Sequence, residues 1–184
     1  MKPEITAKAL LDFWFSEPMN KHWFSSTSEI DQEITSKYET IWEQASAGKL
    51  DHWKGSAEGC LALCIILDQL PLNMFRNTPK SFSTEQQAIE ISKFAITQGL
   101  NNEIGDEQIS FLYMPLMHSE NLDDQDLSVK KFAERGLENN LRFAEHHRSL
   151  VKKYGRFPHR NKILGRKNSH PEIEYLESDK AFTG

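Results

Sequence analysis

Apolar residues recur at spacings of three and four along most of the chain, which is the period of an amphipathic helix. No segment alternates apolar and polar residues as a half-buried strand does. The pattern therefore predicts an all-α fold of about seven helices, the first opening near Pro3. The predicted segments are residues 10–15, 26–45, 56–70, 83–99, 109–117, 123–136 and 138–154, followed by a short turn at 171–178.

Residues that start or stop helices divide these segments. Ser26-x-x-Glu29 and Ser83-x-x-Gln86 resemble capping boxes, in which two side chains satisfy the first free N–H groups of a helix. Pro71 is expected to end the third helix, and Pro115 to kink or shorten the fifth, because proline lacks an N–H and crowds the preceding turn. Gly155 is expected to stop the last long helix as a left-handed cap.

The length of 184 residues suits a single helical domain covering residues 1–184. Short loops between the helices favour antiparallel hairpins stacked in sequence, as in helical-repeat proteins. No strict repeat of about 34 residues is visible, so an irregular bundle is the alternative.

Composition limits the classes of partner. The chain has 22 basic and 27 acidic residues and a formal charge of -5, which argues against broad binding to nucleic acid or to an anionic membrane. The apolar run Cys60–Leu67 is too short to span a bilayer, and residues 1–11 lack the apolar centre of a signal peptide, so we expect a cytoplasmic protein. Cys60 and Cys64 are expected to be buried small hydrophobes, since no other soft ligand lies nearby; no metal and no cofactor are expected.

Charge is segregated along the second half of the chain. Residues 99–129 contain seven acids and no Lys or Arg, whereas residues 142–167 contain nine bases and the single acid Glu145. The two blocks are expected to complement each other if they lie on neighbouring hairpins. Within the basic block, the segment 154–166 (YGRFPHRNKILGR) is either an anion-binding segment or a structural clasp.

Three further observations identify polar residues that depart from a surface pattern. His147 lies on the apolar face of its helix, whereas His146 faces water. Asp68 follows the most apolar stretch and needs a cationic or donor partner, for which Arg76 is the nearest candidate. Tyr113, His118 and Glu120 cluster in LYMPLMHSE, where a histidine and a carboxylate can form a general acid and base pair; as a metal signal this spacing is weak.

The stretches DQLPLNMFR, LYMPLMHSE, the pair His147–Arg148, and above all GRFPHRN followed by LGR resemble the bacterial family of domain of unknown function 924. The resemblance covers nearly the whole chain. It implies a tetratricopeptide-repeat-like, right-handed stack of helices and brings no established activity. Leu72 and Ser149 stand where the family commonly has an arginine and an acid, which weakens any role of these two positions in a polar site.

The candidate site residues taken together are Asp68, Arg76, Tyr113, His118, Glu120, His147, Arg156, His159 and Arg160. The first hypothesis is a binding protein that uses this polar group to hold an anionic small molecule or an acidic peptide. The alternative is a hydrolase or transferase acting on a phosphorylated or carboxylated substrate, with His118 or His159 as acid or base and Glu120 or Asp68 as orienting carboxylate.

A third hypothesis is an adaptor that binds a protein partner through an apolar groove. Its candidate surface residues are the aromatic side chains Trp23, Phe24, Trp42 and Trp53. At helical spacing such residues belong more often to a core than to an interface, so their exposure decides this hypothesis.

Overall fold

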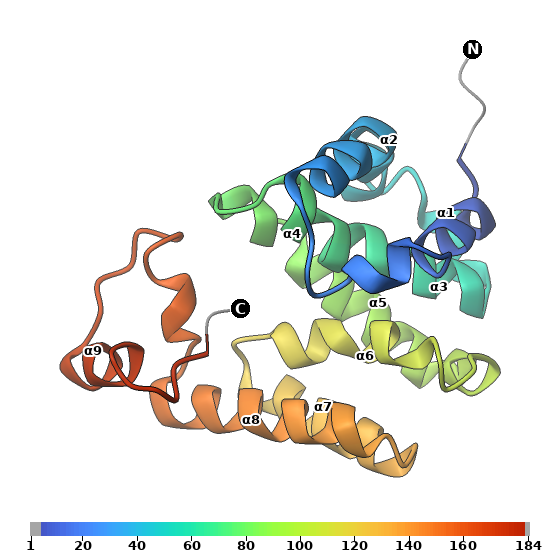
Figure 1. The fold of residues 1–184 in the computed structure, drawn as a ribbon. Coiled ribbons are helices and arrows are strands. Elements are labelled where there is room, and N and C mark those ends of the chain that lie inside the picture. Colours follow the sequence, from blue (N-terminus) through green and yellow to red (C-terminus); the bar gives the residue numbers. More distant parts are fainter. Residues whose placement is uncertain (1–4, 183–184) are drawn as a thin grey trace. The chain divides into compact units, whose positions relative to one another are not determined.

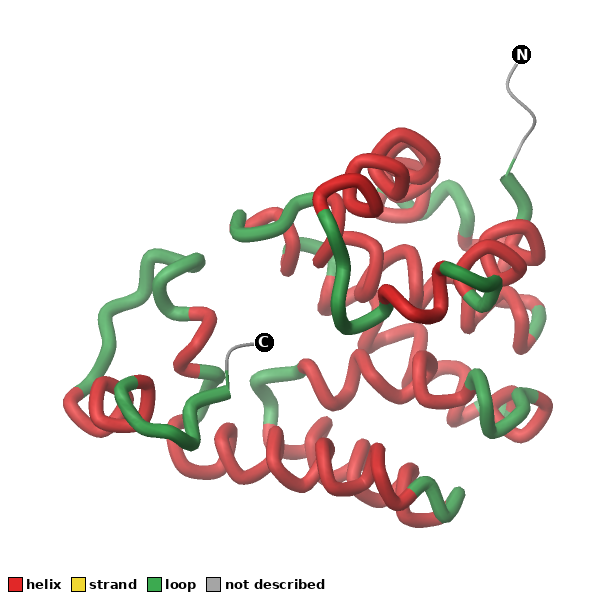
Figure 2. Tube along the Cα trace, viewed as in Figure 1, coloured by secondary structure: helices red, strands yellow, loops and turns green. Residues whose placement is uncertain are grey.

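The computed structural model describes residues 5–182, which form helices and loops and contain no strand (Figures 1 and 2). This confirms the all-α prediction; Pro3, expected to open the first helix, lies outside the described residues. The α-helices are α1 (Ala7–Trp14), α2 (Ser28–Ser46), α3 (Ala57–Cys64), α4 (Leu70–Met74), α5 (Glu85–Thr97), α6 (Ile109–His118), α7 (Leu122–Glu134), α8 (Glu138–Tyr154) and α9 (His170–Leu176).

The chain divides into two compact units. Unit 1 comprises the chain up to Arg76 together with Lys80–Pro115, and unit 2 comprises Asn77–Pro79 together with the chain from Leu116 onward. Two such units can belong to one domain, so the single domain and the repeat-like stacking of its hairpins stay predictions.

The core of unit 1 is the apolar stretch that begins with α3. It packs against α1, α2 and α5, and Cys60 and Cys64 are buried and free in it, as predicted. The 18 residues Ala57–Met74 are long and apolar enough to cross a membrane, but 83% of this window is buried inside the protein. Such burial is typical of the central helix of a soluble domain.

The prediction that Pro71 ends the third helix is wrong. A π-helical turn, Ile65–Gln69, follows α3 and leads directly into α4, with Pro71 in its first turn. Proline has no N–H to donate to the carbonyl of Leu67, four residues earlier. The Thr84 hydroxyl donates to that carbonyl instead, at 2.6 Å. The chain therefore stays helical because a side chain from another segment replaces the missing donor.

Two other predicted helix signals need correction. α6 passes through Pro115 to His118, so this proline does not shorten the helix, and the kink predicted as the other outcome stays a prediction. The N-cap of α2 is Thr27, whose side chain accepts from the Ile30 N–H at 3.3 Å. Ser26, expected to be the cap, donates its hydroxyl to Asp31 at 2.8 Å instead.

The second predicted capping box, Ser83-x-x-Gln86, is also wrong. The N-cap of α5 is Thr84, and its side chain makes no capping bond. The Thr84 hydroxyl is already committed, because it donates to Leu67 and accepts from the Trp42 indole N–H at 3.1 Å.

Unit 2 is built on the hairpin of α7 and α8, which lie side by side (Figure 1). α8 spans Glu138–Tyr154 as predicted, and Gly155 ends it in the left-handed conformation with φ 73°. The chain then folds back over the end of α8, where Phe157 packs on Leu150 and Val151. This return places the segment 156–166 next to the end of α6.

We predict that Gly59→Ala destabilises unit 1 by about 3 kcal/mol or more, because of overpacking in a core. A Cβ at Gly59 would lie 1.8 Å from the Trp53 carbonyl oxygen, a backbone atom that has no rotamer with which to retreat. Urea unfolding followed by tryptophan fluorescence measures the change.

Gly55→Ala is the matched control, because a Cβ there meets nothing within 4 Å. An equal effect of the two substitutions on the free energy of unfolding would contradict the packing of α3 against the preceding turn.

Candidate functional site

The residue that organises unit 2 is Glu120, just beyond the end of α6. Its carboxylate accepts two hydrogen bonds from the Arg166 guanidinium, at 2.7 and 2.8 Å, and one from the Phe157 N–H at 2.8 Å. Burial raises the pKa of Glu120, but the hydrogen bonds from Arg166 and Phe157 outweigh it, so its pKa lies below the ordinary value. Glu120 is therefore a fixed carboxylate that ties the basic segment to the end of α6.

The acidic and basic blocks of the sequence do complement each other, as predicted. Glu120 of the acidic block pairs with Arg166 of the basic block. On the neighbouring hairpin, Asp126 of α7 pairs with Arg148 of α8.

A second bidentate pair holds α9. Arg156 donates to both oxygens of Glu172, at 2.7 and 2.9 Å, and to the Lys167 carbonyl at 2.7 Å. The Glu172 side chain is 2% exposed and also accepts from the Ser169 N–H as part of a capping box. The hydrogen bond from Arg156 is the main cause that lowers the pKa of Glu172 to about 2. Of the two roles considered for the segment 154–166, Arg156 has the contacts of a structural clasp.

Arg160, in the turn Pro158–Arg160, makes different contacts from those of Arg156. Its side chain is buried, its guanidinium carbon lies 4.9 Å from the centre of the Phe157 ring, and Nη2 donates to the His118 carbonyl at 2.9 Å. Arg160 therefore brings a positive charge next to both an aromatic ring and a histidine of α6.

Three imidazoles gather around Phe157. The ring centres of His118 and His147 lie 6.2 Å apart, and the Phe157 ring lies 5.5 Å from His147 and 5.7 Å from His159. The ring of Phe182 lies 4.9 Å from His147 and 5.0 Å from His159. We call these five side chains the histidine cluster.

Two histidines of the cluster, the buried His147 and the half-buried His159, are neutral near pH 7. Burial, and then the neighbouring His118, lower the pKa of His147 to about 3. Burial, and then the charge of Arg160, lower the pKa of His159 to about 4. His147 Nδ1 lies 2.7 Å from the Phe143 carbonyl and so carries the proton, which leaves Nε2 as an acceptor.

His159 contains an unusual polar atom. Its Nδ1 is buried and has no hydrogen-bond partner among the described residues. Most buried polar atoms in proteins have a partner, and an exception calls for an explanation such as a ligand or water.

Three of the predicted site residues lie in unit 1, where they make separate contacts. Arg76 pairs with Asp31 through two hydrogen bonds, at 2.6 and 3.0 Å, so its expected role as the partner of Asp68 is wrong. Asp68 is buried and accepts from the Gln69 amide at 2.6 Å. Tyr113 is also buried, and its hydroxyl accepts from the Asn101 amide at 3.1 Å.

The other six predicted residues, His118, Glu120, His147, Arg156, His159 and Arg160, belong to unit 2. Sequence reasoning missed Glu172, which lies in a stretch predicted only as a short turn. It also missed Phe182, for which the sequence offers no signal. Arg166 was visible in the segment 154–166, but its partner Glu120 was not predictable from spacing.

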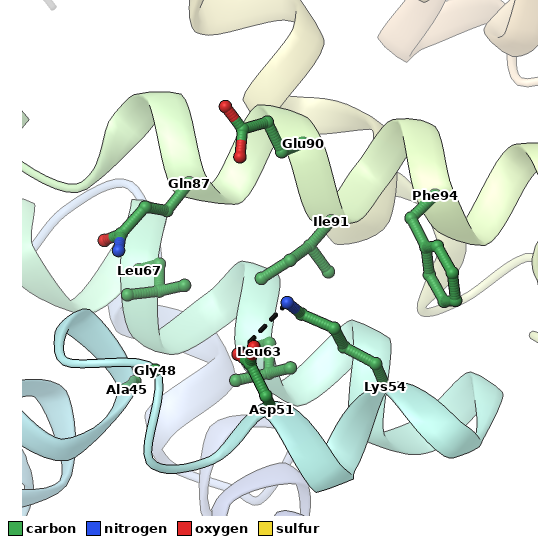
Figure 3. Close-up of a pocket in the computed structure, with 10 residues that line it drawn as sticks. All are labelled: Ala45, Gly48, Asp51, Lys54, Leu63, Leu67, Gln87, Glu90, Ile91 and Phe94. Carbon is green, nitrogen blue, oxygen red and sulfur yellow. Dashed lines mark ion pairs between the residues drawn. The ribbon is translucent and has the colours of Figure 1, made fainter.

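Unit 1 contains a separate open pocket with a volume of about 290 Å³ (Figure 3). Leu63, Leu67 and Ile91 form its apolar floor. An ion pair between Lys54 and Asp51, 3.0 Å long, lies at its rim. None of the predicted site residues lines this pocket. Within residues 5–182, no group of three or more His, Cys, Asp or Glu side chains is placed to hold a metal ion.

The fold and the cluster define an all-α protein in which histidines and phenyl rings lie together beside a segment fixed by two arginine–glutamate pairs. Residues 10–180 match the family model described as bacterial protein of unknown function (DUF924), so the chain belongs to this family. A solved structure of a protein of unknown function from Agrobacterium tumefaciens is similar to it, with 33% identity, a TM-score of 0.88, and coverage of 93% of this chain and 96% of that one. No curated protein matches the chain.

We predict that Glu172→Gln lowers the thermal midpoint by about 5 °C or more, because it leaves Arg156 without its anion and removes a buried carboxylate from the N-terminus of α9. Differential scanning calorimetry measures the midpoint. Glu174→Gln is the control, because Glu174 is 69% exposed on the same helix. Equal midpoints for the two variants would show that the clasp contributes nothing.

We also predict that the protein loses stability as the pH falls from 6.5 to 5. In this range the unfolded chain binds protons at His147 and His159, whereas the folded chain, with pKa values of about 3 and 4 there, does not. The free energy of unfolding should fall by up to about 1.4 kcal/mol per pH unit for each histidine. The carboxylates with lowered pKa values change the free energy of unfolding only at lower pH, where the carboxylates of the unfolded chain begin to bind protons, near pH 4.

Urea unfolding at pH 7.5, 6.5 and 5.5 checks this slope, and His147→Gln should reduce it. A slope that this substitution leaves unchanged would mean that His147 is not held neutral by the fold.

Proposed function

We propose that the protein is a binding protein, located in the cytoplasm, whose histidine cluster holds a small anionic molecule such as a carboxylate or phosphate. The observation that carries the proposal is the buried Nδ1 of His159, which has no hydrogen-bond partner among the described residues. A ligand oxygen close to this atom would supply the missing partner.

Neutral imidazoles suit an anion whose binding is coupled to proton uptake. A neutral imidazole has one N–H donor and one lone pair, and it becomes a double donor when it gains a proton. A bound anion favours the charged form of a nearby histidine, so its arrival raises the histidine pKa. Arg160 adds a fixed positive charge beside His159. Affinity is therefore linked to pH.

The contacts of Glu120 favour binding over the alternative of a hydrolase or transferase. Arg166 and the Phe157 N–H engage both carboxylate oxygens, and the pKa of Glu120 lies below its ordinary value. A carboxylate held in this way stays ionised near neutral pH and is a poor proton donor. Its contacts position the segment 156–166 instead.

The adaptor hypothesis receives less support. Trp42 and Trp53 are 7% and 9% exposed, and Trp23 is half-buried, its indole N–H donating to the Trp14 carbonyl at 2.8 Å. Phe24 is 76% exposed and is the aromatic candidate that remains available to a protein partner.

We predict that His159→Phe weakens the binding of inorganic phosphate or acetate about tenfold or more, because it removes a hydrogen-bonding group that contacts a charged ligand. Titration calorimetry measures the affinity. In buffers of different ionisation enthalpy it also measures proton uptake, and wild-type affinity should rise from pH 7.5 to 5.5.

His170→Phe is the control, because His170 is 84% exposed in unit 2. Binding that is independent of pH and unchanged in His159→Phe would contradict the proposal. Binding of short acidic peptides, but of neither small anion, would move the ligand class to peptides.

A further inference from the structure

The histidine cluster already contains an aromatic side chain from the end of the described chain. The Phe182 ring meets His146, His147 and His159 at distances of 5.9, 4.9 and 5.0 Å, with interplanar angles of 69°, 69° and 86°. Edge-to-face contact of this kind is a favoured arrangement for aromatic rings. A single phenyl ring thus contacts two imidazoles of the proposed binding site, those of His147 and His159, and the exposed His146 beside them.

The segment that carries Phe182 is short and lies mostly in solvent. Residues 177–180, between the end of α9 and Ala181, are all exposed. The Phe182 N–H donates to the Tyr175 hydroxyl at 2.8 Å, and Tyr175 packs on Tyr154 of α8 with ring centres 5.4 Å apart. α9, in turn, is fixed by the clasp of Arg156 and Glu172. The segment therefore extends from a firmly held helix, and Phe182 at its end packs beside Tyr175 on the core of unit 2.

We infer that residues 177–182 form an intramolecular strap that occupies the histidine cluster, and that the external ligand is a small aromatic acid whose ring replaces that of Phe182. The inference rests on the proposed function and adds two features to it. The first is the aromatic part of the ligand, since a site that accepts one phenyl ring edge-to-face can accept another. The second is regulation, since the ligand and the strap compete.

The competition has a measurable consequence. When only a fraction of the molecules is in the binding-competent state, the apparent affinity equals the intrinsic affinity multiplied by that fraction. Removing Phe182 should therefore tighten the binding of an aromatic acid by about tenfold or more, if the strap is closed at least nine-tenths of the time.

The strap also accounts for part of the burial of the histidines, which gives a readout without ligand. Removing the Phe182 ring should expose His147 and His159 to water and raise their pKa values toward the ordinary value. The charged or titratable groups that face these two histidines are His118, His146, Glu120, Arg160 and Arg166.

The test compares wild type, Phe182→Ala and Phe143→Ala. Phe143 is 59% exposed on α8 and serves as the control for losing an aromatic side chain. A chain that ends at Ser178 is the second variant if Phe182→Ala folds poorly. Calorimetry measures the affinity of each for phenylacetate and for cyclohexylacetate, and NMR titration of the histidine rings measures the pKa values of His147 and His159.

The inference is supported if Phe182→Ala binds phenylacetate about tenfold or more tightly than wild type and Phe143→Ala do, with a smaller gain for cyclohexylacetate. It is overturned if Phe182→Ala binds phenylacetate with wild-type affinity; the proposed function then stands as long as His159→Phe still weakens the binding of phosphate or acetate about tenfold or more. If no variant binds either acid, the aromatic-acid ligand is overturned, and the titration with phosphate and acetate decides the proposed anion site separately. The NMR titration then decides the strap: unchanged histidine pKa values in Phe182→Ala overturn it, and raised values support a covering role.

Discussion

The arrangement of unit 2 depends on the carboxylate of Glu120. This carboxylate accepts hydrogen bonds from the Arg166 guanidinium and from the Phe157 N–H. It thereby holds a segment 37 to 46 residues away at the end of α6. Substitution of either partner of such a pair destabilises the fold, because the other partner is left as an uncompensated charge in a partly buried place. Fixing Phe157 and Arg166 at the same point also orients the turn between them, which carries His159 and Arg160. The positions of Phe157 and His159 in the histidine cluster therefore depend on an ion pair outside it.

The basic segment 154–166 suggested an anion site, yet most of its arginines bind anions that belong to the protein. Arg156 is neutralised by Glu172 and Arg166 by Glu120, each in the bidentate geometry that a guanidinium prefers. These two pairs enclose the turn that presents Arg160 and His159. The arginines thus act mainly as a frame, and the chemistry offered to a ligand comes from the histidines.

Sequence reasoning predicted what depends on local pattern. The bounds of α8, its left-handed end at Gly155, and the inward and outward directions of His147 and His146 follow from periodicity and glycine, and the structure has them. The errors arose where a distant residue changes a local rule. Pro71 leaves the helix intact because Thr84 supplies the missing donor, and Arg76 pairs with Asp31, which offers it two oxygens. Neither partner can be identified from spacing along the chain.

The neutral state of the histidines links the frame to the proposed function. A cluster of imidazolium ions next to Arg160 would repel itself and would lose much of its hydration, so the fold keeps His147 and His159 uncharged. The Phe182 ring makes edge-to-face contacts with neutral imidazoles, whereas charged imidazoles also need hydrogen-bond acceptors, which a phenyl ring does not offer. An anion reverses this preference, since it stabilises the protonated ring and competes for the same space. The strap and the ligand are thus two occupants suited to two protonation states of one cluster, and proton uptake is the step that would exchange them.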